Sequence, residues 1–87
     1  MPRHDFKTVI TILKALRGEA LTPYKLLKIL PISHRNVLDR YLKYMVDLDL
    51  IQSRPNSRGG KEYFLSEDGE VLIQLLGKKI RVKILTL

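Results

Sequence analysis

The sequence predicts an α+β fold that is mainly helical, with a three-helix core, a β-hairpin, a fourth helix and a C-terminal extension. Two observations lead to this fold class. Apolar residues recur at three-and-four spacing in four separate stretches, which is typical of helices with one buried face. Between the third and fourth stretches, two short β-prone runs flank a turn rich in Gly, Asn and Ser, as in a hairpin. Residues 1–87 are expected to form a single domain.

The first two helices carry start and stop signals. Asp5 is expected to cap the first helix and Gly18 to close it, because aspartate accepts bonds from free helix N–H groups and glycine adopts the left-handed conformation. The predicted buried stripe of this helix is Phe6, Val9, Ile10, Leu13 and Leu16. Thr22 as N-cap, followed by Pro23 at the first helical position, predicts a short second helix that ends near Leu30.

The third helix is the longest that the pattern predicts. Pro31 cannot extend the preceding helix, so a new helix is expected to start at Ser33 and to run to about residue 48. Its predicted buried positions are Leu38, Tyr41 or Leu42, Met45 and Leu48. The same spacing leaves a polar side that consists of Arg35, Asn36, Asp39, Arg40, Lys43 and Asp47.

The C-terminal third is expected to hold the hairpin and the fourth helix. Turn-forming residues separate the runs 51–54 and 62–65, which predicts two strands joined by a loop of about five residues. Ser66 is expected to cap a helix whose first turn is acidic, as the helix dipole favours. The predicted apolar side of this helix is Val71, Leu72, Leu75 and Leu76. Residues 77–87 fit either a strand or a continued helix, and a break after Leu76 with a strand beyond it is favoured.

The composition excludes several classes of protein. No apolar run approaches the roughly 18 residues that a membrane span requires, and no apolar signal core is present, so a cytoplasmic protein is expected. The lack of cysteine excludes disulfides and thiol chemistry. His4 and His34 lie far apart in the sequence, and neither a metal-ligand spacing nor a phosphate loop is present. No enzyme activity, metal, cofactor or small-molecule ligand is therefore expected.

The charge indicates a polyanionic partner. The chain has a net charge of +7 and a pI near 9.9. Residues 1–46 contain nine Lys and Arg against three acids, residues 47–76 three against six, and residues 77–87 four against none. The alternative is an ordinary solvated surface, and composition alone does not separate the two interpretations.

The order of these elements resembles a winged-helix DNA-binding domain. The segments that carry the resemblance are LTPYKLLKILPISHRNVLDRYLKYMVDLDLIQSR and KEYFLSEDGEVLIQLL, within roughly residues 5–76. The family is that of compact transcription regulators frequent in archaea and their viruses, which are related to bacterial multiple-antibiotic-resistance repressors. Its second wing strand leads through Tyr-x-Leu-Thr and a glycine into the next helix, and YFLSEDG matches this. Asp49 replaces the family's glycine after the third helix, a departure that aspartate tolerates.

The resemblance implies a sequence-specific double-stranded DNA-binding protein that regulates transcription, with its third helix in the major groove. The residues that it implies as base readers are His34, Arg35, Asn36, Asp39 and Arg40. Those implied as contacts to the DNA backbone are Lys25, Lys28, Ser33, Lys43 and Tyr44. The wing, residues 54–61, would contact the backbone or the minor groove through Arg54, Asn56, Ser57, Arg58 and Lys61.

These assignments have structural alternatives. In the structural alternative, Arg35 and Asp39 form an i,i+4 ion pair on a solvated side of the helix, and Tyr44 packs partly into the core. The charges at the hairpin tip would only protect the sheet edge. For the whole chain, the alternative function is a winged-helix protein-interaction module without DNA binding, because fold does not fix function. RNA is a weaker candidate partner, because no clear platform of exposed aromatic residues is evident.

The resemblance also implies a homodimer, since helix-turn-helix proteins commonly read two half-sites about one DNA turn apart. One candidate dimer surface is the apolar side of the first helix, around Phe6 and Ile10. The other is a dimerisation tail, residues 77–87, with Ile80, Val82, Ile84, Leu85 and Leu87.

Overall fold

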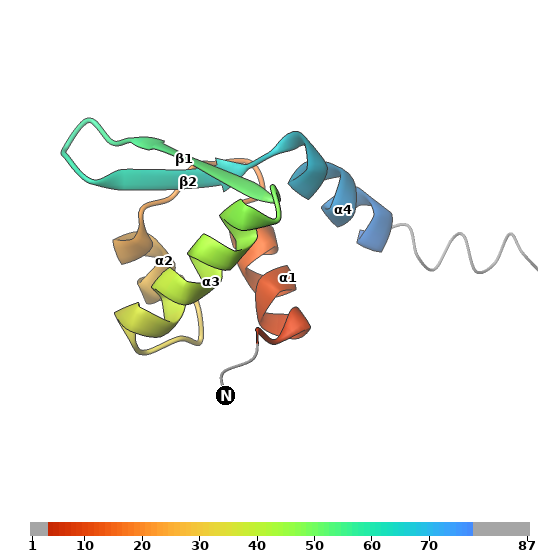
Figure 1. Cartoon of the computed structure of the whole chain (residues 1–87), viewed down its shortest axis with the longest axis horizontal. Coiled ribbons are helices and arrows are strands. Elements are labelled where there is room, and N and C mark those ends of the chain that lie inside the picture. The colour runs from red at the N-terminus through yellow and green to blue at the C-terminus, as the bar shows by residue number, and fades with distance from the viewer. Residues whose placement is uncertain (1–3, 78–87) are drawn as a thin grey trace, which may run out of the picture.

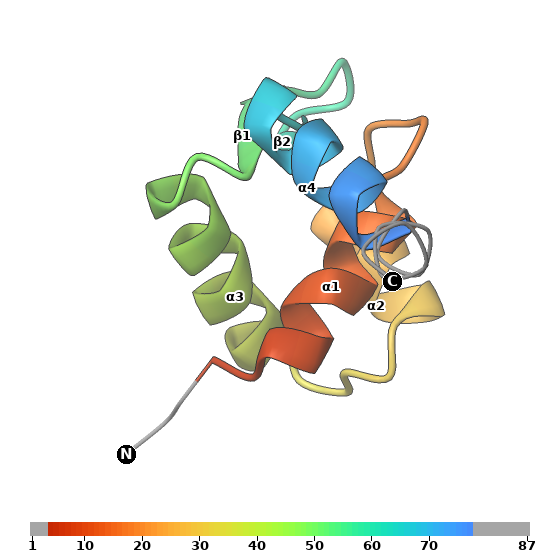
Figure 2. The same cartoon turned by 90° about the vertical axis from the view of Figure 1, so that its right-hand side faces the viewer.

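The computed structural model describes residues 4–77, which form four helices and one antiparallel hairpin (Figure 1). In chain order the elements are α1 (Phe6–Ala15), α2 (Pro23–Ile29), α3 (Arg35–Asp47), β1 (Ile51–Pro55), β2 (Lys61–Leu65) and α4 (Glu67–Gly77). The predicted α+β, mainly helical fold class is confirmed. In the view of Figure 2, α2 and α3 flank α1, while the hairpin and α4 lie across the top.

One hydrophobic core joins the three N-terminal helices to the root of the hairpin. Its largest fully buried side chains are Ile12, Leu13, Leu16, Leu26, Leu38, Leu42, Met45 and Ile51. Along α3 the buried positions follow the predicted spacing, and both Tyr41 and Leu42 face the core. The amphipathic stripes of the helices therefore meet in a single core under β1.

Four apolar side chains that were predicted to be buried are instead largely exposed: Phe6, Leu48, Val71 and Leu75. Phe6 is the first residue of α1, and Leu48 is the C-cap of α3, so each lies at a helix end that extends past the core. In α4 the buried face runs through Gly69 and Ile73. Apolar periodicity did not predict this buried face of α4, because one of its residues is a glycine and carries no apolar side chain.

The start signals of α1 and α2 are confirmed only in part. Asp5 occupies the N-cap of α1, but its carboxylate accepts from the Thr8 hydroxyl at 3.2 Å and caps no backbone N–H group, which corrects the predicted cap. Gly18 closes the turn after α1 with φ +89°, as predicted. At α2, Thr22 Oγ1 accepts from the Lys25 backbone N–H at 3.2 Å, which confirms the predicted N-cap.

The boundaries of α3 differ slightly from the prediction. The helix begins at Arg35 and not at Ser33, because the first helical bonds of this segment run to the His34 carbonyl, which makes His34 the N-cap. After the helix, Asp49 takes the left-handed conformation with φ +60°. The aspartate therefore adopts the conformation that a glycine takes most readily, and the chain turns into β1 without interruption.

Asp49→Gly is expected to raise the free energy of unfolding by about 0.5 kcal/mol, because a left-handed conformation strains any side chain with a Cβ. Asp49→Val is expected to lower it by roughly 1–2 kcal/mol, because a branched side chain is strained most. Urea unfolding followed by circular dichroism measures both changes. A glycine variant that is less stable than the original chain would contradict this interpretation.

The hairpin has a regular register and is attached to α2. β1 and β2 pair from Ile51↔Leu65 to Pro55↔Lys61, which leaves the loop 56–60, as long as predicted. An additional bridge joins Leu21 to Tyr63, with N···O distances of 2.9 and 2.8 Å. The segment before α2 is thereby hydrogen-bonded to the middle of β2, which holds the hairpin beside α2.

The junction between β2 and α4 is also fixed. Ser66 is the predicted cap of α4, and its hydroxyl accepts from the Gly69 N–H at 3.0 Å while it donates to the Asp49 carbonyl. Gly69 lies so close to Leu50 that an added Cβ would be 2.0 Å from the Leu50 carbonyl oxygen. Only glycine fits this contact, which sets the orientation of α4.

α4 continues to Gly77, one residue beyond the predicted break after Leu76, and the rest of the candidate dimerisation tail lies outside the described residues. Within residues 4–77, no helix combines the length and the apolar character needed to span a bilayer.

Candidate nucleic-acid interface

The exposed side of α3 carries polar and charged residues from its first turn to its last. Because the buried residues of α3 occupy one side, helical periodicity places Asn36, Arg40, Lys43 and Asp47 near the centre of the opposite side. All five residues predicted to read bases are exposed: His34, Arg35, Asn36, Asp39 and Arg40. The predicted base readers are therefore all accessible, but they are spread around α3, with Arg35 and Arg40 about 140° apart by helical geometry.

The hairpin lies next to the N-terminal half of α3. Burial raises the pKa of Tyr63 on β2 above its ordinary value near 10. The Asp39 carboxylate adds to this rise in pKa, and the Arg35 guanidinium opposes it. Tyr63 and Arg35 also line one groove, so the middle of β2 lies close to the start of α3.

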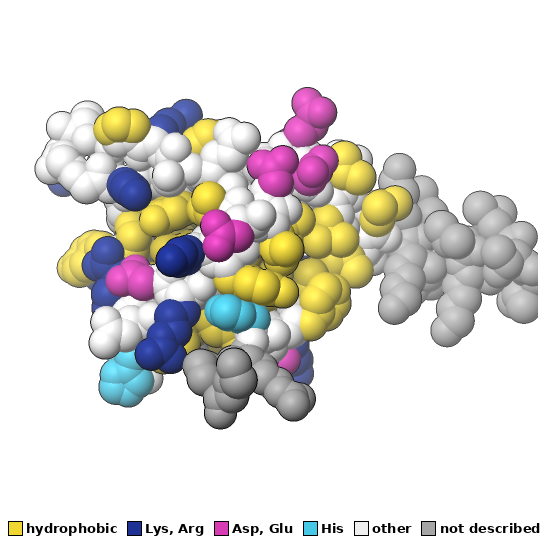
Figure 3. Space-filling view, in the orientation of Figure 1, with side chains coloured by type: hydrophobic (Ala, Val, Ile, Leu, Met, Phe, Trp, Pro, Cys, Tyr) yellow, Lys and Arg dark blue, Asp and Glu magenta, His cyan; other side chains and the backbone are white. Residues whose placement is uncertain are grey.

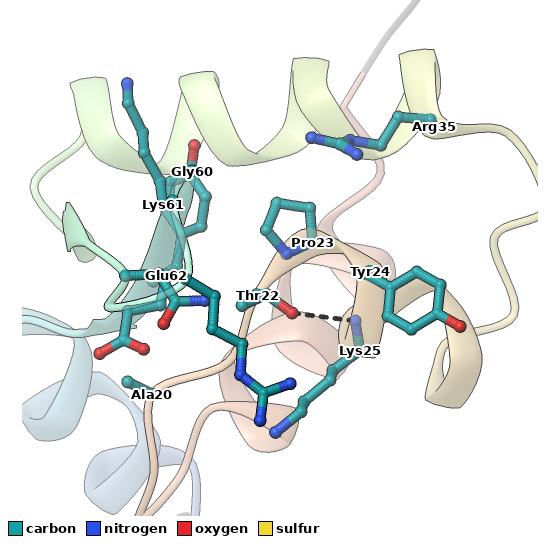
Figure 4. A pocket seen from close by; sticks show the side chains of 13 residues that line it. Ala20, Thr22, Pro23, Tyr24, Lys25, Arg35, Gly60, Lys61 and Glu62 are labelled. Carbon is teal, nitrogen blue, oxygen red and sulfur yellow. Dashed lines mark hydrogen bonds between the residues drawn. The ribbon is translucent and has the colours of Figure 1, made fainter.

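A groove of about 740 Å³ opens between α2, the start of α3 and the hairpin tip (Figure 4). Figure 4 shows Arg35 on α3, Tyr24 and Lys25 on α2, and Lys61 on the hairpin around this opening. Arg58 in the hairpin loop also lines it, and Glu62 is the acidic residue in its lining. Cationic side chains from three elements therefore converge on one concave surface.

The surface charge is unevenly distributed. On the face shown in Figure 3, Lys and Arg side chains gather over α3 and the hairpin, with some acidic side chains among them over α3. Acidic side chains gather over the start of α4, where the first turn contains Glu67, Asp68 and Glu70. The carboxylates in the first turn of α4 interact favourably with the positive end of the dipole of this helix, and they do not line the groove. The basic side of the molecule is therefore the side on which α3 and the hairpin meet.

Comparison with known proteins establishes the architecture. No protein-family model matches the chain, and no curated protein matches it with significance. Among solved structures, it is similar to a PadR family transcription regulator from hypervirulent Clostridium difficile, with a TM-score of 0.70 and 19% sequence identity over 91% of this chain and 92% of that chain. The chain has a winged-helix fold. The hairpin is its wing, and the archaeal or viral subtype stays a prediction.

Three of the predicted contact residues, Arg35, Asp39 and Arg54, are engaged in internal ion pairs. Arg35 Nε donates to Asp39 Oδ1 at 2.9 Å, which is the i,i+4 pairing considered as the alternative. Arg54 Nε donates to Glu62 Oε2 at 2.6 Å, and its guanidinium lies 5.0 Å from the centre of the Phe64 ring. Because exposed pairs contribute only about 0–1 kcal/mol, Arg35 can exchange Asp39 for a stronger acceptor. Arg54 is held by two partners on the flank of the wing.

The wing tip is shaped by its own backbone. The Asn56 N–H donates to the Gly60 carbonyl at 3.0 Å, and the Gly59 N–H donates to the Asn56 carbonyl at 3.0 Å. Asn56 is accordingly half-buried, whereas Ser57 and Arg58 are exposed at the tip. The wing residues therefore divide into a structural turn and an exposed arginine beside the groove.

On α2, the sequence interpretation missed an aromatic residue. Tyr24 is exposed and lines the groove, and the Lys28 ammonium lies 4.5 Å from the centre of its ring. Lys25 is exposed and also lines the groove. The available signal was the position of Tyr24 as the second residue of α2, directly after Pro23 and within the first turn of the helix.

The remaining predicted backbone contacts differ in their surroundings. Lys43 is exposed on α3, and Ser33 is exposed just before this helix. Tyr44 is half-buried against the core, and the imidazole of His4 stacks on its ring with a centroid separation of 4.0 Å. Tyr44 therefore packs partly into the fold, as the structural alternative expects. Within residues 4–77, no group of three or more His, Asp or Glu side chains is placed to hold a metal ion.

Proposed function

We propose that this protein binds double-stranded DNA with sequence specificity and regulates transcription. The observation that carries the proposal is the groove of about 740 Å³, which gathers cations from α2, α3 and the wing beside the exposed side of α3. A duplex offers a matching surface of phosphates, whose neutralisation releases counterions and supplies affinity. The winged-helix fold, shared with a protein described as a transcription regulator, agrees with this function.

In the proposed complex, α3 enters the major groove, which at about 12 Å is wide enough for a helix. Asn36 and Arg40 then face the base edges, where an amide pairs with adenine and a guanidinium with guanine. Arg35 turns from Asp39 to the DNA. Sequence preference thus comes from the first two turns of α3.

The groove beside the wing takes the DNA backbone. Lys25, Arg58 and Lys61 line it from α2 and the wing, and their flexible cationic side chains suit phosphate oxygens. Tyr24 adds a phenolic hydroxyl at the same opening. These contacts position the protein and leave the choice of sequence to α3.

We further propose that the protein acts as a homodimer on two half-sites. Phe6 on α1 is exposed, as a residue at a dimer surface would be in one isolated chain. On α4, Val71 and Leu75 are exposed on the helix that leads into the candidate dimerisation tail. Two protomers would then present two α3 helices to successive turns of one duplex.

Selection of bound duplexes from a random pool tests the proposed function. We expect one enriched consensus with two symmetric half-sites, separated by about 10–10.5 bp or a multiple of that spacing. Failure to bind duplex DNA would reject the function and favour a protein-interaction module. An asymmetric consensus with a single half-site would reject the dimer and keep the DNA-binding function.

Asn36→Ala is expected to relax the preference at one base pair of each half-site, at a cost of about 1–3 kcal/mol on the selected sequence. The affinity for random duplexes is expected to change little, because a neutral amide neutralises no phosphate. Titration of both duplexes at one salt concentration measures the two effects. An equal loss on selected and random DNA would remove Asn36 from the base-reading residues.

A further inference from the structure

The flank of α3 that faces away from the groove carries a second concave surface. This pocket of about 230 Å³ is lined by His4, Arg40, Lys43, Tyr44 and Asp47. The four helical residues stand at three-and-four spacing and form one stripe along α3. Arg35, which lines the groove by the wing, lies about 140° around the helix axis from Arg40 by helical geometry. The groove by the wing therefore reaches one flank of α3, and the His4 pocket extends from the centre of the exposed side to the other flank, where Tyr44 lies.

The position of His4 on this flank is fixed by several contacts. Its ring stacks on Tyr44 with an interplanar angle of 5°, and it meets the Tyr41 ring edge-on at 5.0 Å and 83°. The next residue, Asp5, donates its backbone N–H to the Tyr41 hydroxyl at 2.8 Å. The segment before α1 is thus attached to α3 by two aromatic contacts and one hydrogen bond. Figure 3 shows histidine side chains on the same face as the basic side chains of α3.

We propose that this pocket is a second phosphate-binding subsite, in which protonated His4 acts with Lys43 on the DNA strand opposite the wing, beside Arg40, which reaches the base edges. The inference rests on the proposed function and extends it to a segment outside the helix-turn-helix unit and the wing. A major groove is bounded by two backbones, so a helix inside it has one backbone on each flank. The groove by the wing serves one backbone, and the His4 pocket serves the other.

The charges around His4 favour an anion. Arg40 and Lys43 face the pocket with positive charges, and Asp47, at its far end, carries the opposing negative charge. Tyr41 and Tyr44 contribute neutral rings, and the carboxylate of Asp5 is turned to the Thr8 hydroxyl. Among the residues that line the pocket, two cations therefore oppose one carboxylate before histidine is protonated. Protonation adds a third positive charge.

The sign of the pH dependence follows from this arrangement. A phosphate attracts the positively charged imidazolium more strongly than the neutral ring. Binding of DNA beside His4 therefore favours its protonated form, and protonation in turn favours binding. The additional affinity is therefore present at acidic pH, where histidine carries a proton, and is lost at alkaline pH, where it does not. DNA binding by the wild type is therefore expected to tighten with acidification.

The test measures duplex affinity against salt concentration at about pH 5.5 and about pH 8 for the wild type and two variants. His4→Phe keeps an aromatic ring on Tyr44 without a titratable nitrogen, and His4→Arg keeps a planar group that stacks and remains charged. For the wild type, the slope of log K against log salt is expected to steepen by about 0.9 at the lower pH. His34 is present in all three proteins, so differences between them isolate His4.

Relative to the wild type, His4→Phe is expected to lose this additional steepening, and His4→Arg to show the steep slope at both pH values. The subsite is overturned if His4→Phe steepens as much as the wild type. Should His4→Phe fail to fold, as judged by circular dichroism, His4→Arg decides: its slope at about pH 8 must exceed that of the wild type by about 0.9. A wild type that binds no duplex at either pH overturns the proposed function and the subsite together.

Discussion

Gly69→Ala is expected to lower the free energy of unfolding by about 3 kcal/mol, which is a large fraction of the stability of a domain of this size. An alanine Cβ at this position would lie 2.0 Å from the Leu50 carbonyl oxygen and 3.1 Å from its carbonyl carbon. Both are backbone atoms, so no side-chain rotation relieves the overlap. Either α4 or the chain between α3 and β1 must move.

Neither segment can move without losing hydrogen bonds. The Leu50 carbonyl accepts from the Ser66 N–H at 3.0 Å, and the Leu50 N–H donates to the Met45 carbonyl at 2.9 Å. A shift of α4 would also pull Ile73 from the core. The cost of Gly69→Ala therefore combines steric overlap with the loss of buried contacts.

Urea unfolding followed by circular dichroism measures this cost, and Gln74→Ala provides the matched control. Gln74 is exposed on the same helix, so its replacement is expected to change the free energy of unfolding by no more than about 0.5 kcal/mol. If Gly69→Ala were as stable as Gln74→Ala, the close approach of α4 to Leu50 would be wrong.

Local signals in the sequence predicted most of the fold. Thr22 and Ser66 cap helices as predicted, and the turn residues after β1 produce the predicted hairpin. Asp49 takes the left-handed conformation that its place in the family pattern requires. Each of these signals depends on neighbours within a few residues, so it can be recognised from the sequence without knowledge of tertiary contacts.

Burial in α4 was not predictable from periodicity alone. Val71 and Leu75 fit an apolar stripe as well as Ile73 does, and hydrophobicity cannot rank these faces. The choice between them depends on the approach of Gly69 to Leu50, a contact between two elements that the sequence pattern treats separately. Tertiary packing therefore decided the orientation of this helix.

The candidate site was predicted as a set of exposed residues but not as a shape. Helical spacing correctly predicted that the polar side of α3 is exposed. The groove depends on the Leu21–Tyr63 bridge, which holds the wing against α2 and has no local sequence signature. In the same way, the stacking of His4 on Tyr44 joins residues 40 positions apart. Both concave surfaces arise from contacts between distant segments.

The place of the positive charge, more than its amount, distinguishes DNA binding from the alternative of a protein-interaction module. A basic surface that serves only solubility works wherever its charges lie. A surface that binds a duplex requires them at the groove, because each phosphate contact releases counterions and adds about 0.9 to the salt slope. Two variants of equal net charge that differ only in the position of the lost charges therefore separate these functions.

The triple substitution Lys25→Gln, Arg58→Gln and Lys61→Gln is expected to weaken binding to all duplexes on the order of a hundredfold at about 50 mM salt, and to flatten the salt slope by about 2.7. All three side chains line the groove beside the wing and are exposed, so the fold is expected to be retained. Fluorescence anisotropy across a salt series measures affinity and slope together.

The matched control removes the same charge from α1 and its end through Lys7→Gln, Lys14→Gln and Arg17→Gln, which are exposed and line neither the groove nor the His4 pocket. Each triple substitution lowers the net charge from +7 to +4. If DNA lies against α3 and the wing, the control flattens the slope by no more than about 0.9, because Lys7 alone is close to His4 in the chain and distant charges are screened within about 10 Å at 0.1 M salt. Equal slopes for the two triple variants would mean that binding follows net charge alone, and the groove would then have no role as a DNA site.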